Sequence, residues 1–173
     1  SLLEKYLTEE ECAPQQKTKL QVLKWAENAV FEEYTPEFSD KTRAFLKIED
    51  GCESYCSYCK IPYARGPVRS LSPARVLSEL ERLVGEGFKE IVLVGIHLGV
   101  YGKDLGENLF SLLSRIERAF KRRSRETRFR LSSIEPSDLR PDLAALITTS
   151  ELFCPHLHIP LQSGADRVLH RMN

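Results

Sequence analysis

Residues 45–59 read Phe-Leu-Lys-Ile-Glu-Asp-Gly-Cys-Glu-Ser-Tyr-Cys-Ser-Tyr-Cys, a mostly apolar stretch that runs directly into three closely spaced cysteines. Cys52, Cys56 and Cys59 have the spacing C-x3-C-x2-C. The segment from Ala44 to Ile48 is typical of a short β-strand. We therefore expect the cysteines to lie on a loop after the carboxyl end of a strand, where βα folds place their active sites.

The rest of the chain repeats this strand pattern, each time followed by the pattern of an amphipathic helix. The further strands are expected at 91–94, 129–132 and 157–161, and the helices at 73–87, 109–120, 139–148 and 165–172. Ser72 is a suitable cap for the first helix, and Ser137 or Asp138 for the third. Four βα units in succession favour an α/β fold with a parallel sheet or a partial barrel, because a closed barrel needs about eight strands.

Length and composition favour one folded domain with a core. The chain has 173 residues, of which 42% are hydrophobic and 29% charged. Its 25 basic and 25 acidic residues balance, so the overall charge does not indicate a nucleic-acid partner. No apolar run is long enough to cross a bilayer, and we expect a cytoplasmic protein without a membrane partner.

The domain organisation is expected to change near residue 40. Residues 1–40 are less regular, although 20–31 could form a helix, and we interpret them as a linker or the tail of an upstream domain. Residues 41–173 are interpreted as the core domain. Because four units cannot close a barrel, we expect this domain to be incomplete at its C-terminal end and part of a longer protein.

The cysteine motif indicates metal chemistry, since three of the five cysteines fall within eight residues. Three thiolates on one loop can hold a cubane iron–sulfur cluster and leave one iron without a protein ligand. That iron can chelate the amino and carboxylate groups of S-adenosylmethionine (SAM). An electron passed to the sulfonium then breaks a carbon–sulfur bond and forms a 5′-deoxyadenosyl radical.

Two other interpretations of the motif stay open at this point. A non-catalytic zinc-binding module would need a fourth ligand from elsewhere in the chain, such as His97, Cys154 or Cys12. A redox-active dithiol is the second alternative, since Cys56 and Cys59 form a C-x2-C pair.

The sequence resembles the radical SAM methylthiotransferases over about residues 38–173. The likeness is carried by four stretches, which are 45–66, 90–102, 130–136 and 154–164. Their Gly-Ile-His-Leu-Gly and Ser-Ser-Ile-Glu-Pro strings are most similar to the branch that acts on tRNA. That branch adds a methylthio group to carbon 2 of N6-threonylcarbamoyladenosine, next to the anticodon. Sister branches modify isopentenyl-adenosine in tRNA or an aspartate of a ribosomal protein.

The resemblance implies a partial barrel of the radical SAM type and a set of cofactors and partners. These are a 4Fe-4S cluster on the three cysteines, SAM, an electron donor, and tRNA as the substrate of the full-length protein. Family members carry a second 4Fe-4S cluster on an N-terminal domain with three further cysteines, whereas here only Cys12 precedes the motif. We therefore do not expect this segment alone to insert sulfur.

Five residues at the expected carboxyl edge of the sheet are candidates to bind SAM. The resemblance implies Tyr58, Gly95 and Gln162, and the end of the third expected strand indicates Ser133 and Glu135. Tyr58 lies where radical SAM proteins often contact the adenine, and Gly95 lies where related enzymes contact the SAM amino group. Ser133 and Glu135 share one face of their strand by alternation. Glu135 is a candidate for the ribose or the ammonium of SAM, and Gln162 for SAM or ribose. The structural alternatives are loop packing for Tyr58, turn geometry for Gly95 and a helix cap or ion pair for Glu135.

Other polar residues carry weaker expectations. His97 is expected to be a hydrogen-bonded structural histidine rather than a contact to ligand or substrate, and Cys154 a small buried residue. Arg65 and Arg69 either neutralise a carboxylate or phosphate near the site or lie on the surface. The basic run 121–130 is interpreted as a solvated helix end on the far side of the barrel, rather than as a tRNA-binding surface.

Overall fold

The computed structural model describes Phe31 and residues 42–121 and 126–172. The expected linker 1–40 and the expected helix within it lie outside these residues, apart from Phe31. Among the described residues, no helix is both long enough and apolar enough to cross a membrane.

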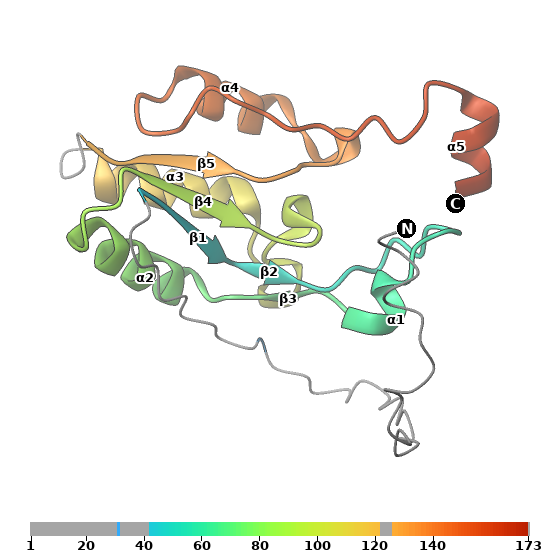
Figure 1. Cartoon of the computed structure of the whole chain (residues 1–173), viewed down its shortest axis with the longest axis horizontal. Coiled ribbons are helices and arrows are strands. Elements are labelled where there is room, and N and C mark those ends of the chain that lie inside the picture. The colour runs from blue at the N-terminus through green and yellow to red at the C-terminus, as the bar shows by residue number, and fades with distance from the viewer. Residues whose placement is uncertain (1–30, 32–41, 122–125, 173) are drawn as a thin grey trace, which may run out of the picture.

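A parallel three-stranded sheet forms the centre of the molecule (Figure 1). Its strands are β1 (Arg43–Lys47), β4 (Glu90–Val94) and β5 (Arg128–Leu131), in the order β1-β4-β5. Side chains of β1 alternate, with Ala44 and Leu46 buried against the core. The expected strands at 44–48, 91–94 and 129–132 are thus confirmed, with ends shifted by about one residue.

Helices α2 (Pro73–Gly85), α3 (Leu109–Phe120) and α4 (Pro141–Thr149) bury apolar side chains in the core, and α2 and α3 lie between successive strands of the sheet. The last helix, α5 (Asp166–Met172), has no buried residue. As expected, the Ser72 hydroxyl caps α2 by accepting the Arg75 amide at 3.4 Å. The core includes Ile91, Leu93, Leu113, Ile116 and Phe129.

The prediction of a fourth strand at 157–161 is wrong, because these residues form no regular strand. Only an isolated parallel bridge, between Ser133 and His158, marks its place beside the end of β5. Pro155 and Pro160 have no amide hydrogen to donate, so a continuous ladder cannot form there. The segment still runs parallel to β5 and leads into α5, which keeps the α/β order of a partial barrel.

The start of the third helix also differs from the expectation. Residues Pro136–Asp138 form a 3-10 turn, and α4 begins only at Pro141. Arg140, not Ser137 or Asp138, occupies the capping position and makes no side-chain cap. Asp138 is used elsewhere, as described below.

A small insertion that the sequence pattern did not indicate separates β1 from α2. It contains β2 (Glu49–Asp50), α1 (Ile61–Arg65) and β3 (Arg69–Ser70), and β2 pairs with β3 in antiparallel fashion. The cysteine loop and α1 both lie between β2 and β3, so this pair holds the two ends of the segment that carries the cysteines (Figure 1).

Candidate functional site

The cysteine loop lies at the edge of the sheet where the parallel strands end. Cys52, Cys56 and Cys59 are all partly exposed. The Cys52 amide donates to the Gly66 carbonyl at 3.0 Å, which closes the loop onto the end of α1. Gly51 has φ +95°, and a Cβ there would collide with the Pro67 carbonyl. Only glycine therefore lets the chain turn from β2 into the loop.

The electrostatics of the loop favour a cationic ligand. Burial, and then the charges of Cys52 and Cys59, raise the pKa of the Cys56 thiol. Three thiolates this close repel one another, and iron ions offset that repulsion. The donor set therefore fits an iron–sulfur cluster, in which each cysteine binds its own iron.

The described residues contain no group of three or more His, Cys, Asp and Glu side chains arranged to hold a single metal ion. Of the fourth zinc ligands considered above, Cys12 lies outside the described residues. Cys154 is buried as expected, and its sulfur lies 3.8 Å from Glu90 Oε2 at the start of β4, away from the loop. His97 does reach the loop.

His97 links the cysteine loop to the turn after β5. Its Nε2 lies 2.7 Å from Asp138 Oδ2, and because a carboxylate only accepts, Nε2 donates. Its Nδ1 then faces the Ser54 hydroxyl at 3.4 Å and Cys52 Sγ at 3.7 Å. A Cβ on Gly99 would collide with Asp138, so that glycine permits the contact. The expectation that His97 is a hydrogen-bonded histidine is confirmed, and its ring is in contact with Cys52.

Glu49 is a buried carboxyl group that the sequence pattern did not single out. It is 0% exposed, and its Oε2 accepts the His97 amide at 2.7 Å. Its Oε1 has no hydrogen-bond partner among the described residues. Burial raises the pKa of Glu49 to about 7, against a weaker opposing effect of the His97 amide. A Cβ on Gly95 would lie 2.6 Å from Glu49 Oε2, so Gly95 is needed for this packing whatever else it contacts.

Three of the expected SAM-binding residues form one hydrogen-bonded chain. The Tyr58 hydroxyl donates to Gln162 Oε1 at 2.7 Å, and Gln162 Nε2 donates to Glu135 Oε1 at 3.4 Å. Gln162 has φ +62°, a left-handed conformation that non-glycine residues rarely adopt. Strain of this kind concentrates at functional sites. The contact brings together the cysteine loop, the end of β5 and the segment before α5.

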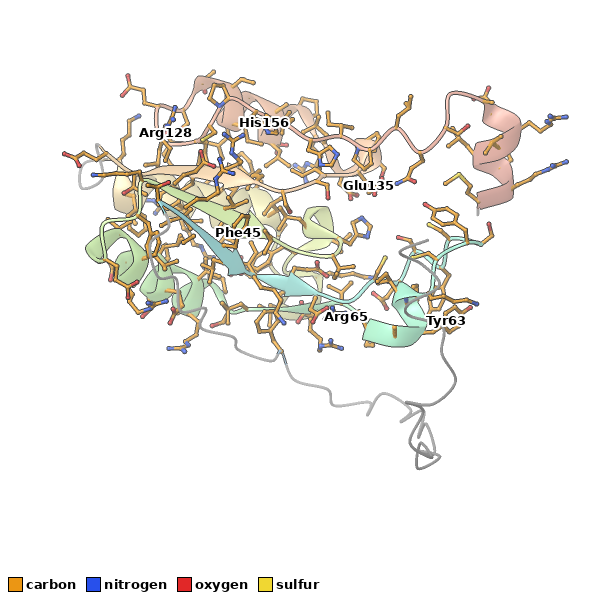
Figure 2. All side chains as sticks on the ribbon, in the orientation of Figure 1. Phe45, Tyr63, Arg65, Arg128, Glu135 and His156 are labelled. Carbon is orange, nitrogen blue, oxygen red and sulfur yellow. The ribbon has the colours of Figure 1, made fainter. Side chains whose placement is uncertain are left out.

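The remaining expected residues lie at the same edge. Gly95 follows β4, and Ser133 follows β5, where its backbone pairs with His158. In Figure 2, Glu135 lies toward the end of the sheet that carries α1 and α5, and Arg128 lies at the opposite end. The end of α5 also packs on the loop, since the Ser57 amide and hydroxyl donate to the carbonyls of Met172 and Arg171, each at 2.9 Å.

Arg65 and Arg69 do neutralise a carboxylate, which is one of the two roles expected for them from the sequence. Both contact Asp50 Oδ2, at 3.5 and 3.7 Å. The basic run 121–130 is described only in part, and within it Arg130 pairs with Glu90 at 2.9 Å. That hydrogen bond lowers the pKa of Glu90 and ties β5 to β4.

Several curated bacterial proteins are similar to this chain in sequence. Threonylcarbamoyladenosine tRNA methylthiotransferase MtaB of Bacillus subtilis is 45% identical over 145 residues, which cover 83% of this chain and 32% of that protein. The Thermotoga maritima protein of the same name is 42% identical, with the same coverage. The tRNA-2-methylthio-N(6)-dimethylallyladenosine synthase of Pelotomaculum thermopropionicum is 39% identical, covering 82% and 31%. The chain thus spans about a third of the length of these curated relatives.

A solved structure and a family model agree on the fold. The radical S-adenosylmethionine methyltransferase TsrM of Kitasatospora setae matches with a TM-score of 0.60 at 18% identity, over 73% of this chain and 23% of that one. The likeness extends to the fold alone. The model of the radical SAM superfamily matches residues 46–173, well over half of the chain. This chain therefore belongs to the radical SAM superfamily.

Proposed function

We propose that this chain is the SAM-binding core of a tRNA methylthiotransferase that acts on N6-threonylcarbamoyladenosine next to the anticodon. The observation that carries the proposal is the ranking of relatives. Those named for threonylcarbamoyladenosine are 45% and 42% identical, whereas one named for dimethylallyladenosine is 39% identical.

Membership of the superfamily implies a 4Fe-4S cluster and SAM, and Cys52, Cys56 and Cys59 are the residues that would hold the cluster. When bound, the cluster supplies the electron that cleaves SAM into methionine and a 5′-deoxyadenosyl radical. The role of the protein is to place the adenine C2–H beside that radical and to keep water away. The carboxyl edge of the sheet, where the loop, β4 and β5 meet, is suited to this task.

Tyr58, Gly95, Ser133, Glu135 and Gln162 are proposed to bind SAM. The hydrogen-bonded chain Tyr58–Gln162–Glu135 supports this, because it assembles polar groups from three separate segments beside the cysteines. An amide such as Gln162 can exchange these internal bonds for bonds to the ligand. Glu135 would then offer its carboxylate to ribose hydroxyls or to the SAM ammonium.

The proposal extends to the longer protein. Residues 1–40 would be a linker or the tail of an upstream domain, and 41–173 the radical SAM core. The upstream domain would carry a second 4Fe-4S cluster that supplies or relays sulfur, a second SAM would supply the methyl group, and an electron donor would reduce the core. We further propose that the protein acts in the cytoplasm.

The experiment is a comparison of substrates with the full-length, anaerobically reconstituted protein. It is incubated with SAM, dithionite and tRNA carrying either threonylcarbamoyladenosine or isopentenyl-adenosine, and nucleosides are identified by mass spectrometry. Methylthio addition to the first tRNA alone is the expected result. Addition to the second tRNA, or to a ribosomal protein instead, would transfer the proposal to a sister branch. Stoichiometric zinc that resists exchange for iron would overturn it.

A further inference from the structure

Two tyrosines and two cations form an exposed group on the outer side of the cysteine loop. Tyr55 and Tyr63 are 52% and 67% exposed, and their rings meet edge to face at 5.8 Å. Lys60 Nζ lies 6.0 Å from the centre of the Tyr63 ring. Arg65, at the end of α1, completes the group, which we call the α1 patch. Large aromatic rings left this exposed beside cations are a feature of binding surfaces.

Three cations share one buried carboxylate beneath the α1 patch. A single carboxylate, Asp50, contacts Lys47, Arg65 and Arg69 at 3.3, 3.5 and 3.7 Å. The Asp50 side chain is only 7% exposed, while that of Arg65 is 50% exposed. An approaching molecule therefore meets the cations rather than the carboxylate. Exposed positive charge of this kind is complementary to phosphate.

The α1 patch is continuous with the cluster loop. Tyr55 directly precedes Cys56, and Lys60 directly follows Cys59. Figure 2 shows Tyr63 and Arg65 on α1, at the end of the sheet toward which Glu135 also lies. Anything bound on the patch thus lies beside the loop that carries the cysteines.

We propose that the α1 patch binds the unpaired RNA nucleotides next to the adenosine that enters the site. This rests on the proposed function. A base that reacts must leave its stack, and its neighbours then lose stacking partners. Tyr55 and Tyr63 offer ring faces to those bases, while Lys60 and Arg65 contact their phosphates. Aromatic rings interleaved with cations are the usual means of binding single strands without reading their sequence.

The test measures how salt affects binding of the holoenzyme to a fluorescently labelled anticodon stem–loop RNA that carries threonylcarbamoyladenosine. Tyr63→Ala should weaken binding about 5- to 100-fold at every salt concentration, with the salt dependence unchanged. Lys60→Gln should instead lower the slope of log Kd against log salt by about 0.7. Tyr63→Phe and Lys60→Arg are the matched controls and should bind almost as well as the wild type. Lys121→Gln, at the end of α3, should change neither quantity.

Cluster content is measured in every variant from its visible absorbance, which separates loss of binding from loss of the fold. Unchanged RNA binding by both Tyr63→Ala and Lys60→Gln would overturn the inference and leave the proposed function standing. Normal RNA binding with slower reduction by a protein electron donor would also overturn it, since the patch would then dock that protein. A wild-type holoenzyme that binds no anticodon stem–loop would overturn both proposals.

Discussion

Glu49 allows a quantitative test of the buried end of β2. Its carboxyl group is 0% exposed and has one oxygen without a partner among the described residues. Replacement by glutamine keeps the shape and an oxygen that can accept the His97 amide, but removes the titrating proton. The comparison of wild type with Glu49→Gln therefore isolates the cost of ionising this group.

The magnitude follows from the shift of the pKa. Glutamate ordinarily titrates at 4.5, and burial raises the pKa of Glu49 to about 7. Between these values the unfolded chain has lost the proton and the folded chain keeps it, so the free energy of unfolding falls as pH rises. Each pKa unit corresponds to about 1.4 kcal/mol, so about 3 kcal/mol of stability is lost between pH 4.5 and pH 7. The Glu49→Gln variant has no carboxyl group to ionise at this position, so it does not lose this stability.

The assay is urea denaturation of the cluster-free chain, followed by circular dichroism at several pH values from 4.5 to 8. The stability of Glu49→Gln relative to the wild type should rise by about 3 kcal/mol across this range. Glu151→Gln, which changes an exposed carboxylate, serves as the matched control and should show no such trend. A Glu49→Gln difference that is constant with pH would refute the assignment of a raised pKa to Glu49.

Two further predictions concern the supports of the site. Gly99→Ala introduces a Cβ that collides with Asp138, and it should cost about 1–3 kcal/mol in urea denaturation and reduce cluster retention. Gly85→Ala, where a Cβ meets no atom within 4 Å, should not destabilise the chain, and equal effects of the two changes would contradict the packing argument. Gln162→Gly relieves the left-handed backbone but removes the bonds to Tyr58 and Glu135. By calorimetry it should raise the Kd for SAM about 2- to 10-fold with cluster content unchanged, and an unchanged Kd would remove Gln162 from the SAM site.

The regular part of the fold was predictable because its periodic signals are local. The apolar run of β4 and the helical spacing of α2 and α3 lie within single segments, and their positions agree with the structure to within about two residues. Prolines explain the failure at 157–161, where the apolar pattern indicated a strand but the backbone lacks donors. The pairing of β2 with β3 involves two residues on each strand, which is too short to leave a pattern.

Within the site, the residues nominated from the resemblance do lie at one edge, but their supports were not predictable. His97 and Asp138 are 41 residues apart, and only the parallel order of β4 and β5 brings their loops together. Glu49 reads as an ordinary surface charge, since glutamate is rarely fully buried. Its burial follows from the close approach of Gly95, which a sequence pattern does not reveal.

The central proposal is that Cys52, Cys56 and Cys59 hold a cluster in which one iron stays open to SAM. The most direct measurement is the electron paramagnetic resonance spectrum of this 173-residue chain by itself, reconstituted anaerobically, reduced, and recorded with and without SAM. We predict the signal of a 4Fe-4S cluster that shifts when SAM is added, and no such signal in Cys56→Ala. A cluster spectrum that SAM leaves unchanged, or a cluster that persists in Cys56→Ala, would contradict the central claim.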